Sequence, residues 1–461
     1  MTAAKEANSV IKSILDYILK LEYDSLPATT IRFVKLHLLD TLGAIIAGSK
    51  AECTGFIMPI VQKWGGSKEA TVFVYGTSLP ADCAALVNAI MARGYDFESL
   101  LGNGATHVPA AIIPAAFAFA EYLKNESKIN VSGKELLAAI TLGMDLHYRF
   151  RVAGGAATTM GGGWLAETFA PLAVAATGAK LLKLDPPKTM GALLMAYNQC
   201  AGNYGATIGE GGALVAQFGQ GLSVRAGVIS TLSAAHGLSA PLKDIFTSKW
   251  GLYEMYGGGY CDIKILTGNL GRQFSHLKPI IKRYPGCGGL QSAVHAMLSI
   301  INYHKIDAQN IRTVYVEVSP LNYEQVVRNR SFPSSPSEAL WNMRFMLALA
   351  IAYGNVGPEH LSRNSLADDR VRSIYSIIEI VPNSNLRVEE VIVTLYTTDN
   401  SKHTLHLLET PPVSPTEIHD KFIRCCGFVA LPSVRAYDIF QKIRNIEREE
   451  DVTTLIYDLV I

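Results

Sequence analysis

Residues 88–120 read NAIMARGYDFESLLGNGATHVPAAIIPAAFAFA, and this stretch decides how the chain is organised. Two apolar, Ala-rich segments typical of helices flank a short Gly- and Asn-rich loop, LLGNGAT. Asp96 and His107 stand at the two ends of this loop. A carboxylate and an imidazole held between rigid helices can act as an acid/base pair. The same residues also suit a helix cap and a turn, so residue types alone leave both roles open.

The composition indicates a well-buried globular protein. The chain has 461 residues, more than one ordinary core supports, and 49% of them are hydrophobic. Charged residues make up 18%, below the usual level of about a quarter, which favours burial of extra surface in an oligomer. The net charge is +1 and no basic run is present, so we expect no nucleic-acid partner.

The sequence indicates a cytoplasmic protein. The N-terminus, MTAAKEANSVIKSILDYILK, has the pattern of an amphipathic helix and lacks the continuous apolar core of a signal peptide. The longest apolar runs, such as AAIIPAAFAFA, are shorter than the roughly 18 residues of a membrane span. The cysteines are scattered without a CxxC pair, which argues against a disulfide framework and a zinc site. We expect Cys425 and Cys426 to be buried as small hydrophobes.

Helical periodicity dominates the chain up to about residue 265. Residues 5–50 carry it twice, and Gly48 is interpreted as a C-cap of the second helix. A short β-like run at residues 70–76 precedes the helix that leads to Asp96. Many small residues in these segments predict close approach between helices.

Strand patterns enter near Phe274. Residues 311–320 alternate as in a strand, and residues 388–409 predict a hairpin that turns at Asp399–Asn400. A helix lies between these strands, and the end of the chain returns to helical periodicity. Residues of roughly 270–400 therefore form an α+β module beside a helical body.

We predict no chemical role for two further features of the sequence. The Gly161–Gly163 run lacks the GK[ST] ending and the β–α frame of a phosphate loop, so we expect no nucleotide there. His147, Arg149 and Arg151 share one helix, and we interpret them as structural or interface residues.

The order of several blocks resembles the MmgE/PrpD family, which includes 2-methylcitrate dehydratase, cis-aconitate decarboxylase and iminodisuccinate epimerase. The resemblance covers essentially the whole chain. Its blocks are LLDTLGAIIAG (38–48), NAIMARGYDFES (88–99), THVPAAIIPAAFAFAE (106–121), AKLLKL (179–184), KRYPGCGGLQSAVHA (282–296) and PSSPSEALWNMRF (333–345).

The resemblance implies a mostly α fold with a large all-helical domain and a smaller α+β lid domain. The expected division places the first part of the helical domain at residues 1–268 and the lid at 269–405. Residues 406–461 return to the helical domain. The family also implies a homodimer that acts on a small molecule, with no metal and no organic cofactor.

The family's catalytic positions are retained in part. Asp96 and His107 match the carboxylate and the histidine of the family's two central segments, and Lys282 and Tyr284 match its KxYP turn. Arg93 stands where the family has a histidine three residues before the aspartate, and it can pair with Asp96 across a helix turn. We therefore predict a proton-transfer pair at Asp96 and His107. Lys282 and Tyr284 would orient a substrate oxygen or stabilise an enolate-like intermediate.

Other family positions are substituted. Trp164 and Gln291 stand at two histidine positions and are interpreted as substrate-binding candidates. The family's lysine falls on Ala216 or Gln217, and the positions after SPSEA are Leu340 and Asn342. Each lost charge-assisted contact would cost on the order of 1.5–3 kcal/mol of binding to a di- or tricarboxylate. We expect a more apolar pocket and a less anionic substrate; Arg344 is a candidate to replace some of the lost charge.

Three functions are compatible with this set of residues. The first is a cofactor-independent lyase that dehydrates or decarboxylates a small carboxylic acid. The second is an isomerase, epimerase or cyclase that uses the same proton abstraction. The third is a binding protein without catalysis, which retention of Asp96, His107 and the Lys282–Tyr284 turn speaks against.

Overall fold

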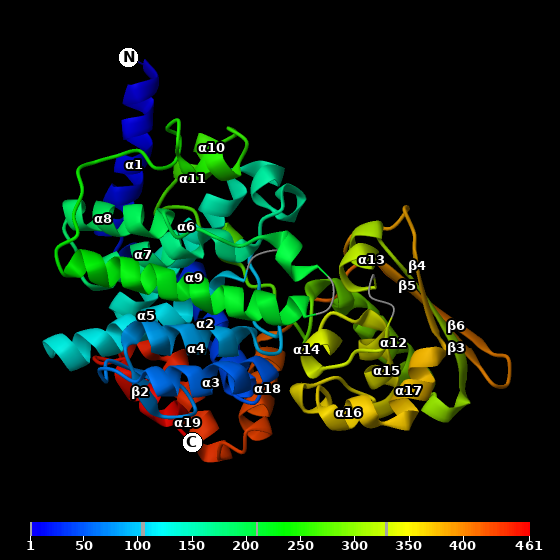
Figure 1. Cartoon of the computed structure of the whole chain (residues 1–461). Coiled ribbons are helices and arrows are strands. Elements are labelled where there is room, and N and C mark those ends of the chain that lie inside the picture. The colour runs from blue at the N-terminus through cyan, green and yellow to red at the C-terminus, as the bar shows by residue number, and fades with distance from the viewer. Residues whose placement is uncertain (1, 103–106, 209–210, 328–330) are drawn as a thin grey trace.

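A computed structural model describes residues 2–102, 107–208, 211–327 and 331–461 (Figure 1). A large helical body stands beside a smaller part that contains both helices and a sheet, as the sequence predicted. Residues 103–106, which belong to the predicted Gly- and Asn-rich loop, lie outside the described residues. Residues 209–210, which precede the helix that begins at Gly212, lie outside them too.

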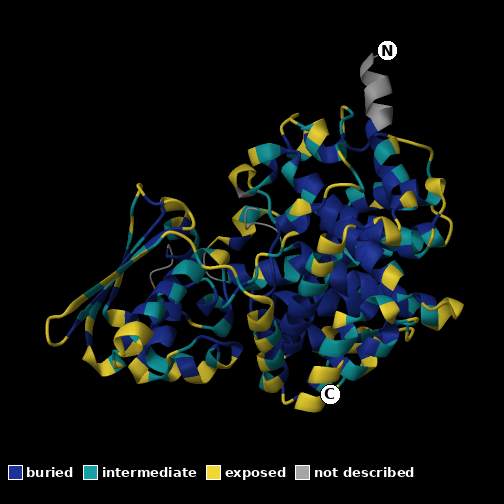
Figure 2. Cartoon of the chain, turned by 180° about the vertical axis from the view of Figure 1, so that it is seen from behind, coloured by how far each residue is buried: buried dark blue, intermediate teal, exposed yellow. Residues whose placement is uncertain are grey.

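The body consists of helices packed around a continuous apolar core, which is dark blue in Figure 2. Its helices are α1 (Thr2–Lys20), α2 (Ala28–Gly48), α3 (Glu52–Trp64), α4 (Ala81–Arg93), α5 (Val108–Ser127), α6 (Gly133–Val152), α7 (Ala170–Leu181), α8 (Pro186–Tyr197), α9 (Gly212–Ala235), α10 (Leu252–Tyr256) and α11 (Ile263–Thr267).

Helix α4 is the element that positions the candidate site. All its residues from Cys83 to Arg93 are buried, because α2, α5 and α9 cover it. Its one amide side chain is used structurally: Asn88 accepts from the backbone N–H of Phe73 at 2.9 Å and donates to the carbonyl of Thr71 at 2.9 Å. These bonds tie α4 to the short strand β1 (Ala70–Val72).

Small residues let α4 approach its neighbours closely, as predicted. A Cβ on Gly48 would lie 1.8 Å from the carbonyl oxygen of Met91 in α4. A Cβ on Gly221 of α9 would lie 2.6 Å from the carbonyl oxygen of Leu86. The interpretation of Gly48 as a C-cap is wrong, because it is the last residue of α2 and Ser49 is the cap. Gly48 is needed for helix packing.

The smaller part carries a four-stranded sheet in the order β4-β3-β5-β6. The strands are β3 (Ile311–Val318), β4 (Ile378–Pro382), β5 (Val391–Thr397) and β6 (Lys402–Leu407). Strand β3 pairs parallel with β4 and antiparallel with β5, and β5 pairs antiparallel with β6. The helices of this part are α12 (Gln291–His304), α13 (Pro320–Val326), α14 (Pro336–Ala339), α15 (Met343–Tyr353), α16 (Arg363–Ala367) and α17 (Asp369–Ser376).

The predicted strand at 311–320 and the hairpin at 388–409 are confirmed. The hairpin turns at Asp399–Asn400, where Asn400 has a φ of 68°. The run at 70–76 is shorter than expected, since β1 ends at Val72 and pairs with β2 (Thr77–Leu79), which periodicity did not indicate. Strand β4 was also missed, because its exposed and buried positions alternate over only five residues.

The last helices, α18 (Pro415–Phe428), α19 (Ser433–Arg444) and α20 (Thr453–Leu459), lie with the body (Figure 1). Buried Lys421 of α18 pairs with Asp40 of α2 at 2.7 Å and donates to the carbonyl of Phe97 at 2.6 Å. The C-terminal segment thus holds the turn that follows α4. The division at residues 268 and 405 stays a prediction.

The apolar helices and two of the cysteines of the described residues bear on predictions made from the sequence. No single described helix is both long and apolar enough to cross a membrane; only α2 and α3 taken together, a pair bent by 79°, have that length and composition. Most of α2 is buried in the core. Cys425 and Cys426 are buried, as predicted, and both are free thiols.

Candidate active site

The turn after α4 places Asp96 in an unusual backbone conformation. Arg93 ends the helix, and the backbone N–H of Asp96 donates to the Arg93 carbonyl at 2.9 Å. Asp96 has a φ of 48°, in the left-handed region that only glycine, asparagine and aspartate visit readily. Such strain persists where the surroundings hold it, and it clusters at functional sites.

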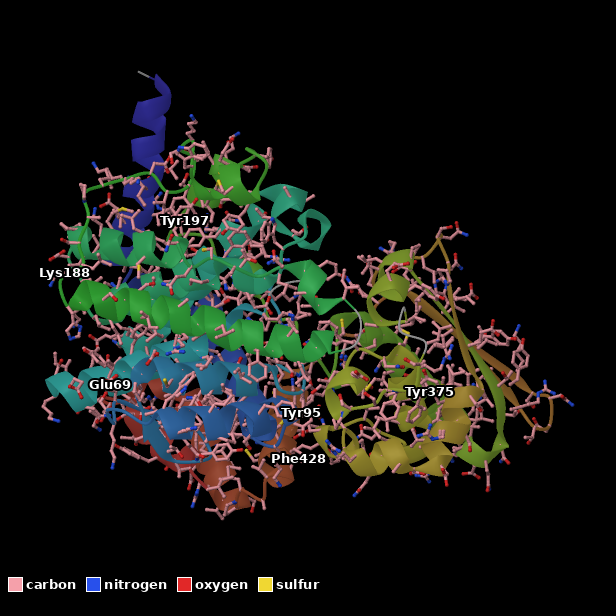
Figure 3. All side chains as sticks on the ribbon, viewed as in Figure 1. Glu69, Tyr95, Lys188, Tyr197, Tyr375 and Phe428 are labelled. Carbon is pink, nitrogen blue, oxygen red and sulfur yellow. The ribbon has the colours of Figure 1, made fainter. Side chains whose placement is uncertain are left out.

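Several contacts hold this turn in place. The Tyr95 ring packs edge-on against Phe428 of α18, with centroids 5.9 Å apart, and the two residues lie together at the foot of the body (Figure 3). The carbonyl of Tyr95 accepts from the backbone N–H of Gly286 at 2.9 Å. Gln217 of α9 donates to the carbonyl of Gly94 at 3.0 Å. The turn is therefore fixed from three sides.

The Asp96 carboxylate is buried and surrounded by donors. Its Oδ1 accepts from Arg93 Nη1 at 2.7 Å and from Lys282 Nζ at 2.5 Å, and its Oδ2 accepts from Trp341 Nε1 at 2.9 Å. Lys282 also donates to the Asp96 carbonyl at 2.7 Å. Burial alone would raise the pKa of Asp96, but Lys282 and Arg93 outweigh it and lower that pKa strongly. Asp96 is thus an anchored anion with little basicity.

Glu98 and His107 form a close pair beside Asp96. His107 Nδ1 lies 2.5 Å from Glu98 Oε1 and 4.0 Å from Asp96 Oδ1. Burial opposes ionisation of Glu98, yet Lys282, Arg93 and His107 lower its pKa to about 2. Burial and then Arg93 lower the pKa of His107 below its ordinary value of 6.5, so its imidazole is neutral near pH 7. A carboxylate at Nδ1 favours the Nδ1–H tautomer and leaves a lone pair on Nε2.

Arg93 joins three carboxylates. Its Nη1 lies 2.7 Å from both Asp96 Oδ1 and Glu98 Oε1, and its Nη2 lies 3.8 Å from Glu167 Oε1. The Nη1 atom also contacts His107, at 2.5 Å from Nδ1 and 3.1 Å from Nε2. Burial lowers the pKa of Arg93, but the carboxylates raise it overall. The predicted pairing with Asp96 is confirmed.

The donor set of Asp96, Glu98 and His107 is one that could hold a metal ion, since one ligand atom from each lies within 4.8 Å of the others. The same carboxylate oxygens, however, already accept from Arg93 and Lys282. A divalent ion would bring its charge against these two buried cations. The residues therefore fit an internal ion-pair network better than a metal, and the expectation of no metal stays a prediction.

The KxYP turn brings only its lysine to Asp96. The Tyr284 hydroxyl lies 3.2 Å from His295 Nδ1. The Gln291 amide accepts from the backbone N–H of Tyr284 at 3.2 Å and donates to its carbonyl at 2.9 Å. Gln291 thus fixes the backbone of the turn, and no described contact joins it or Tyr284 to Asp96. Their substrate roles stay predictions.

Trp164 also lies apart from the described contacts of Asp96. Its ring packs edge-on against Tyr256, with centroids 4.8 Å apart, and its backbone N–H donates to Thr159 at 3.1 Å. The indole is partly exposed. Its predicted substrate contact stays a prediction, and packing against Tyr256 is its observed role.

Sequence reasoning missed three members of the cluster, namely Glu98, Trp341 and Glu167. Glu98 had a signal, because it is a second acid two residues after Asp96 in the block NAIMARGYDFES. Trp341 directly follows the substituted position Leu340. Glu167 had no signal, since only the fold brings the turn η4 (Ala166–Phe169) beside Arg93.

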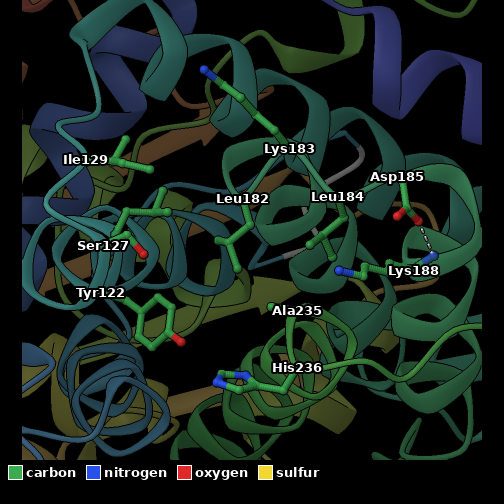
Figure 4. Close-up of a pocket in the computed structure, with 11 residues that line it drawn as sticks. Tyr122, Ser127, Ile129, Leu182, Lys183, Leu184, Asp185, Lys188, Ala235 and His236 are labelled. Carbon is green, nitrogen blue, oxygen red and sulfur yellow. Dashed lines mark hydrogen bonds between the residues drawn. The ribbon is translucent and has the colours of Figure 1, made fainter.

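An open pocket lies away from the Asp96 cluster, between the end of α5, the α7–α8 turn and the end of α9 (Figure 4). Its volume is about 420 Å³. Asp185 accepts from the backbone N–H of Lys188 as the cap of α8, and Lys183 pairs with Glu135 at 3.0 Å. Tyr122 and His236 lie near each other among the lining residues (Figure 4). Of the charged groups that line it, Asp185 and Lys183 thus have structural partners.

Comparisons with known proteins agree on one family. The MmgE/PrpD N-terminal domain matches residues 12–262, and the MmgE/PrpD C-terminal domain matches residues 284–441. The cis-aconitate decarboxylase-like protein oryM of Aspergillus oryzae is 23% identical, and the match covers 99% of this chain and 98% of that protein. The cis-aconitate decarboxylase of Aspergillus terreus is 24% identical over 68% of this chain and 65% of its own length. These similarities support an enzyme.

Proposed function

The chain belongs to the MmgE/PrpD family, and from this we propose that it is a lyase that moves a proton on a small carboxylic acid or a less anionic analogue. The observation that carries the proposal is the buried cluster in which Asp96, His107 and Lys282 meet. The names of two relatives, both decarboxylases or decarboxylase-like, support a lyase. We expect the reaction to need no metal or organic cofactor.

His107 is the proposed base. Its lowered pKa makes it neutral near pH 7, and Glu98 at Nδ1 favours the tautomer with a lone pair on Nε2, which Arg93 Nη1 must release to a substrate proton. In a dehydration, Nε2 takes the proton from the carbon next to the carboxylate, a C=C bond forms, and the C–O bond to the leaving hydroxyl breaks. The imidazolium then returns its proton to that hydroxyl, which leaves as water. In a decarboxylation, the C–C bond to the carboxylate breaks, its electron pair stays on the carbon as carbon dioxide leaves, and a proton supplied by water adds to that carbon.

Lys282 is the proposed holder of a substrate oxygen. An ammonium has three protons, and Lys282 directs two of them to Asp96. The third can donate to an oxygen that gains charge during the reaction. Asp96 holds this ammonium in place. Arg93 pairs with the carboxylates and stabilises the cluster. Tyr284, two residues from Lys282, is the proposed second oxygen donor at the edge of the site.

The placement of the two titratable groups favours a lyase over an epimerase. His107 Nδ1 and Asp96 Oδ1 lie 4.0 Å apart within one buried cluster, so we propose that both meet a substrate from the same face. Inversion of a carbon centre by two bases needs an acid and a base on opposite faces of that carbon. Elimination from a single face needs only the one imidazole and a donor for the leaving group.

Mass spectrometry in deuterium oxide tests this function. A product lighter by one water or one carbon dioxide supports the lyase, whereas deuterium uptake at unchanged formula identifies an isomerase or cyclase. The acid/base assignment is wrong if Asp96→Asn and His107→Ala keep full turnover on the same substrate.

We further propose that the chain works as a homodimer in the cytoplasm. Phe56, Ile60 and Trp64 are 52%, 43% and 52% exposed along one face of α3. Leu222 of α9 is 55% exposed, and Arg225 of α9 stacks 5.0 Å from the Trp64 ring, which joins the two faces. Apolar surface of this kind supports a protein partner. Light scattering should give twice the 49.9 kDa chain mass, and Leu222→Glu should give the monomer.

A further inference from the structure

Helix α6 carries two arginines with different surroundings. Arg149 donates through Nε to Asp145 Oδ1 at 2.6 Å, and through Nη1 to the carbonyls of Ile265 and Gly268, each at 2.8 Å. Arg151 is 2% exposed, and no described residue accepts a hydrogen bond from its guanidinium or pairs with it as an acid within 4.0 Å. A buried cation without a partner is destabilising, so its presence calls for a ligand.

His147 lies one helical turn before Arg151, on the same face of α6. Its Nε2 lies 2.9 Å from the carbonyl oxygen of Ala166, and a carbonyl only accepts, so Nε2 carries the hydrogen. Burial lowers the pKa of His147 to about 4, and the ring is neutral. Its Nδ1 is then a buried acceptor that has no partner among the described residues. The helix thus presents a cationic donor and a neutral acceptor side by side.

This pair adjoins the cluster around Asp96. His147 Nε2 lies 2.9 Å from the carbonyl oxygen of Ala166, and the next residue, Glu167, reaches Arg93 of the cluster. Glu167, 3.8 Å from Arg93, also acts on Arg151: burial lowers the pKa of Arg151 to about 10, and Glu167 opposes that shift.

The charges of this region are balanced before any ligand binds. Its cations are Arg93, Lys282 and Arg151, and its carboxylates are Asp96, Glu98 and Glu167. Of the cations, Arg93 and Lys282 pair with these carboxylates, whereas Arg151 has no carboxylate within 4.0 Å among the described residues. A ligand with one carboxylate meets one available cation. A second carboxylate would be buried beside anions without a partner.

We propose that Arg151 and His147 bind a hydroxy-monocarboxylate, with the carboxylate on Arg151 and the hydroxyl donating to His147 Nδ1. This inference rests on the proposed function, since it supplies the substrate class on which His107 acts. The guanidinium would also receive the charge that grows on the carboxylate as the neighbouring carbon loses its proton. The contact with His147 leaves an oxygen lone pair of the hydroxyl free to take the proton back.

Binding is tested with three probes: 3-hydroxybutyrate, butyrate, which lacks the hydroxyl, and malate, which adds a carboxylate. Titrations followed by ligand-observed NMR should show that 3-hydroxybutyrate binds the wild-type protein more tightly than the other two. Arg151→Met should weaken both monocarboxylates about 10-fold or more. His147→Phe should abolish the difference between 3-hydroxybutyrate and butyrate. Equal binding by Arg151→Met, tighter binding of malate, or no binding of either monocarboxylate at millimolar concentration overturns the proposal.

Thermal unfolding separates a binding arginine from a structural one. Arg151→Met removes an unpaired buried charge and should leave Tm unchanged or raised, whereas Arg149→Met breaks an ion pair and two backbone contacts and should lower it. An equal loss of Tm in both variants makes Arg151 structural and ends the proposal. Because these readouts involve no turnover, they stand apart from the tests of His107: normal turnover in His107→Ala would refute the function and leave the binding site intact.

Discussion

Two buried clusters of this protein contain the same residue types, an aspartate, an arginine and a histidine, and only one of them resembles a reaction site. In the first, Asp145 Oδ1 accepts from Arg149 at 2.6 Å and from His276 at 2.7 Å. Arg149 also donates through Nη1 to the carbonyls of Ile265 and Gly268. This cluster ties α6 to α11 and to the segment that follows it, and its arginine is held by three hydrogen bonds to the protein.

The second cluster is built around Asp96 in a left-handed backbone conformation. It draws Arg93 from the end of α4, Lys282 from the turn before α12 and Trp341 from the segment before α15. Among the described residues, each cluster keeps a buried carboxylate oxygen without a partner, Glu98 Oε2 here and Asp145 Oδ2 in the first cluster. The difference teaches that neither residue type nor an unpartnered polar atom marks a site. The convergence of three carboxylates on two buried cations distinguishes the second cluster.

The most direct test of the comparison replaces the histidine of each cluster by alanine. His107→Ala should reduce the turnover rate by roughly 10²–10⁴-fold, because it removes the proposed base. His276→Ala is the matched control, since His276 also pairs with an aspartate and stacks on Tyr148 with centroids 4.5 Å apart. The control should retain turnover per folded molecule in a steady-state assay. A similar loss in both variants would mean that the two clusters do not differ in function.

The two arginines provide a stability test of the same contrast. Arg93→Met leaves the carboxylates of Asp96, Glu98 and Glu167 buried without their shared cation, and should cost about 3–5 kcal/mol in the free energy of unfolding. Arg149→Met should cost less, because His276 still pairs with Asp145. Urea unfolding of both variants measures the difference. If Arg149→Met is the more damaging change, the cluster at Asp96 is not the more tightly coupled one.

A third test measures the free energy of unfolding as the pH is lowered. Burial lowers the pKa of His147 and of His37 to about 4, whereas the unfolded chain titrates near the ordinary value of 6.5. Between these values the unfolded state binds more protons, so stability is present above pH 6.5 and is lost as pH falls toward 4. Each histidine contributes roughly 3 kcal/mol to this loss by the shift from 6.5 to about 4.

His37 and His147 are expected to contribute through different surroundings. His37 lies 2.7 Å from Ser99 Oγ and 3.0 Å from the carbonyl of Leu277, so it is a satisfied core residue. His37→Gln should flatten part of the profile of unfolding free energy against pH, with no effect on the binding of 3-hydroxybutyrate. An unchanged profile in this variant would contradict the assignment of a depressed pKa to His37.

Periodicity was sufficient for the fold class because it reports which faces are buried. The helices around residues 88–120 and the hairpin at Asp399–Asn400 follow from local patterns, and both were predicted. Strand β4 was missed, because five residues carry too little alternation and its parallel partner lies more than sixty residues away. Gly48 was misread, since its role depends on the carbonyl of Met91 in another helix.

The candidate site was predictable only where chain order brings residues together. Arg93 and Asp96 are three residues apart, and their pairing was predicted and confirmed at 2.7 Å. Glu167 and Trp341 reach the cluster from distant segments, which no spacing rule indicates. Arg151 is a further example. Its position on one helix with Arg149 predicted the same structural role for both, but Arg151 has no partner among the described residues and Arg149 has several.

The smallest expected effect concerns the packing that carries the Asp96 cluster. Gly48→Ala would place a Cβ 1.8 Å from the carbonyl oxygen of Met91, two residues before Arg93, so α2 and α4 must separate. The variant should lose about 1–3 kcal/mol of stability and also some turnover, because the turn at Asp96 begins where α4 ends. Gly55→Ala in α3 is the matched control: its Cβ meets nothing within 4 Å, and it should gain about 0.5–1 kcal/mol from helix propensity alone. The position of α4 matters to one cluster only, so Gly48→Ala should leave the contacts of Arg149 intact. A Gly48→Ala protein as stable and active as the wild type would show that the close approach of α2 and α4 does not position Asp96.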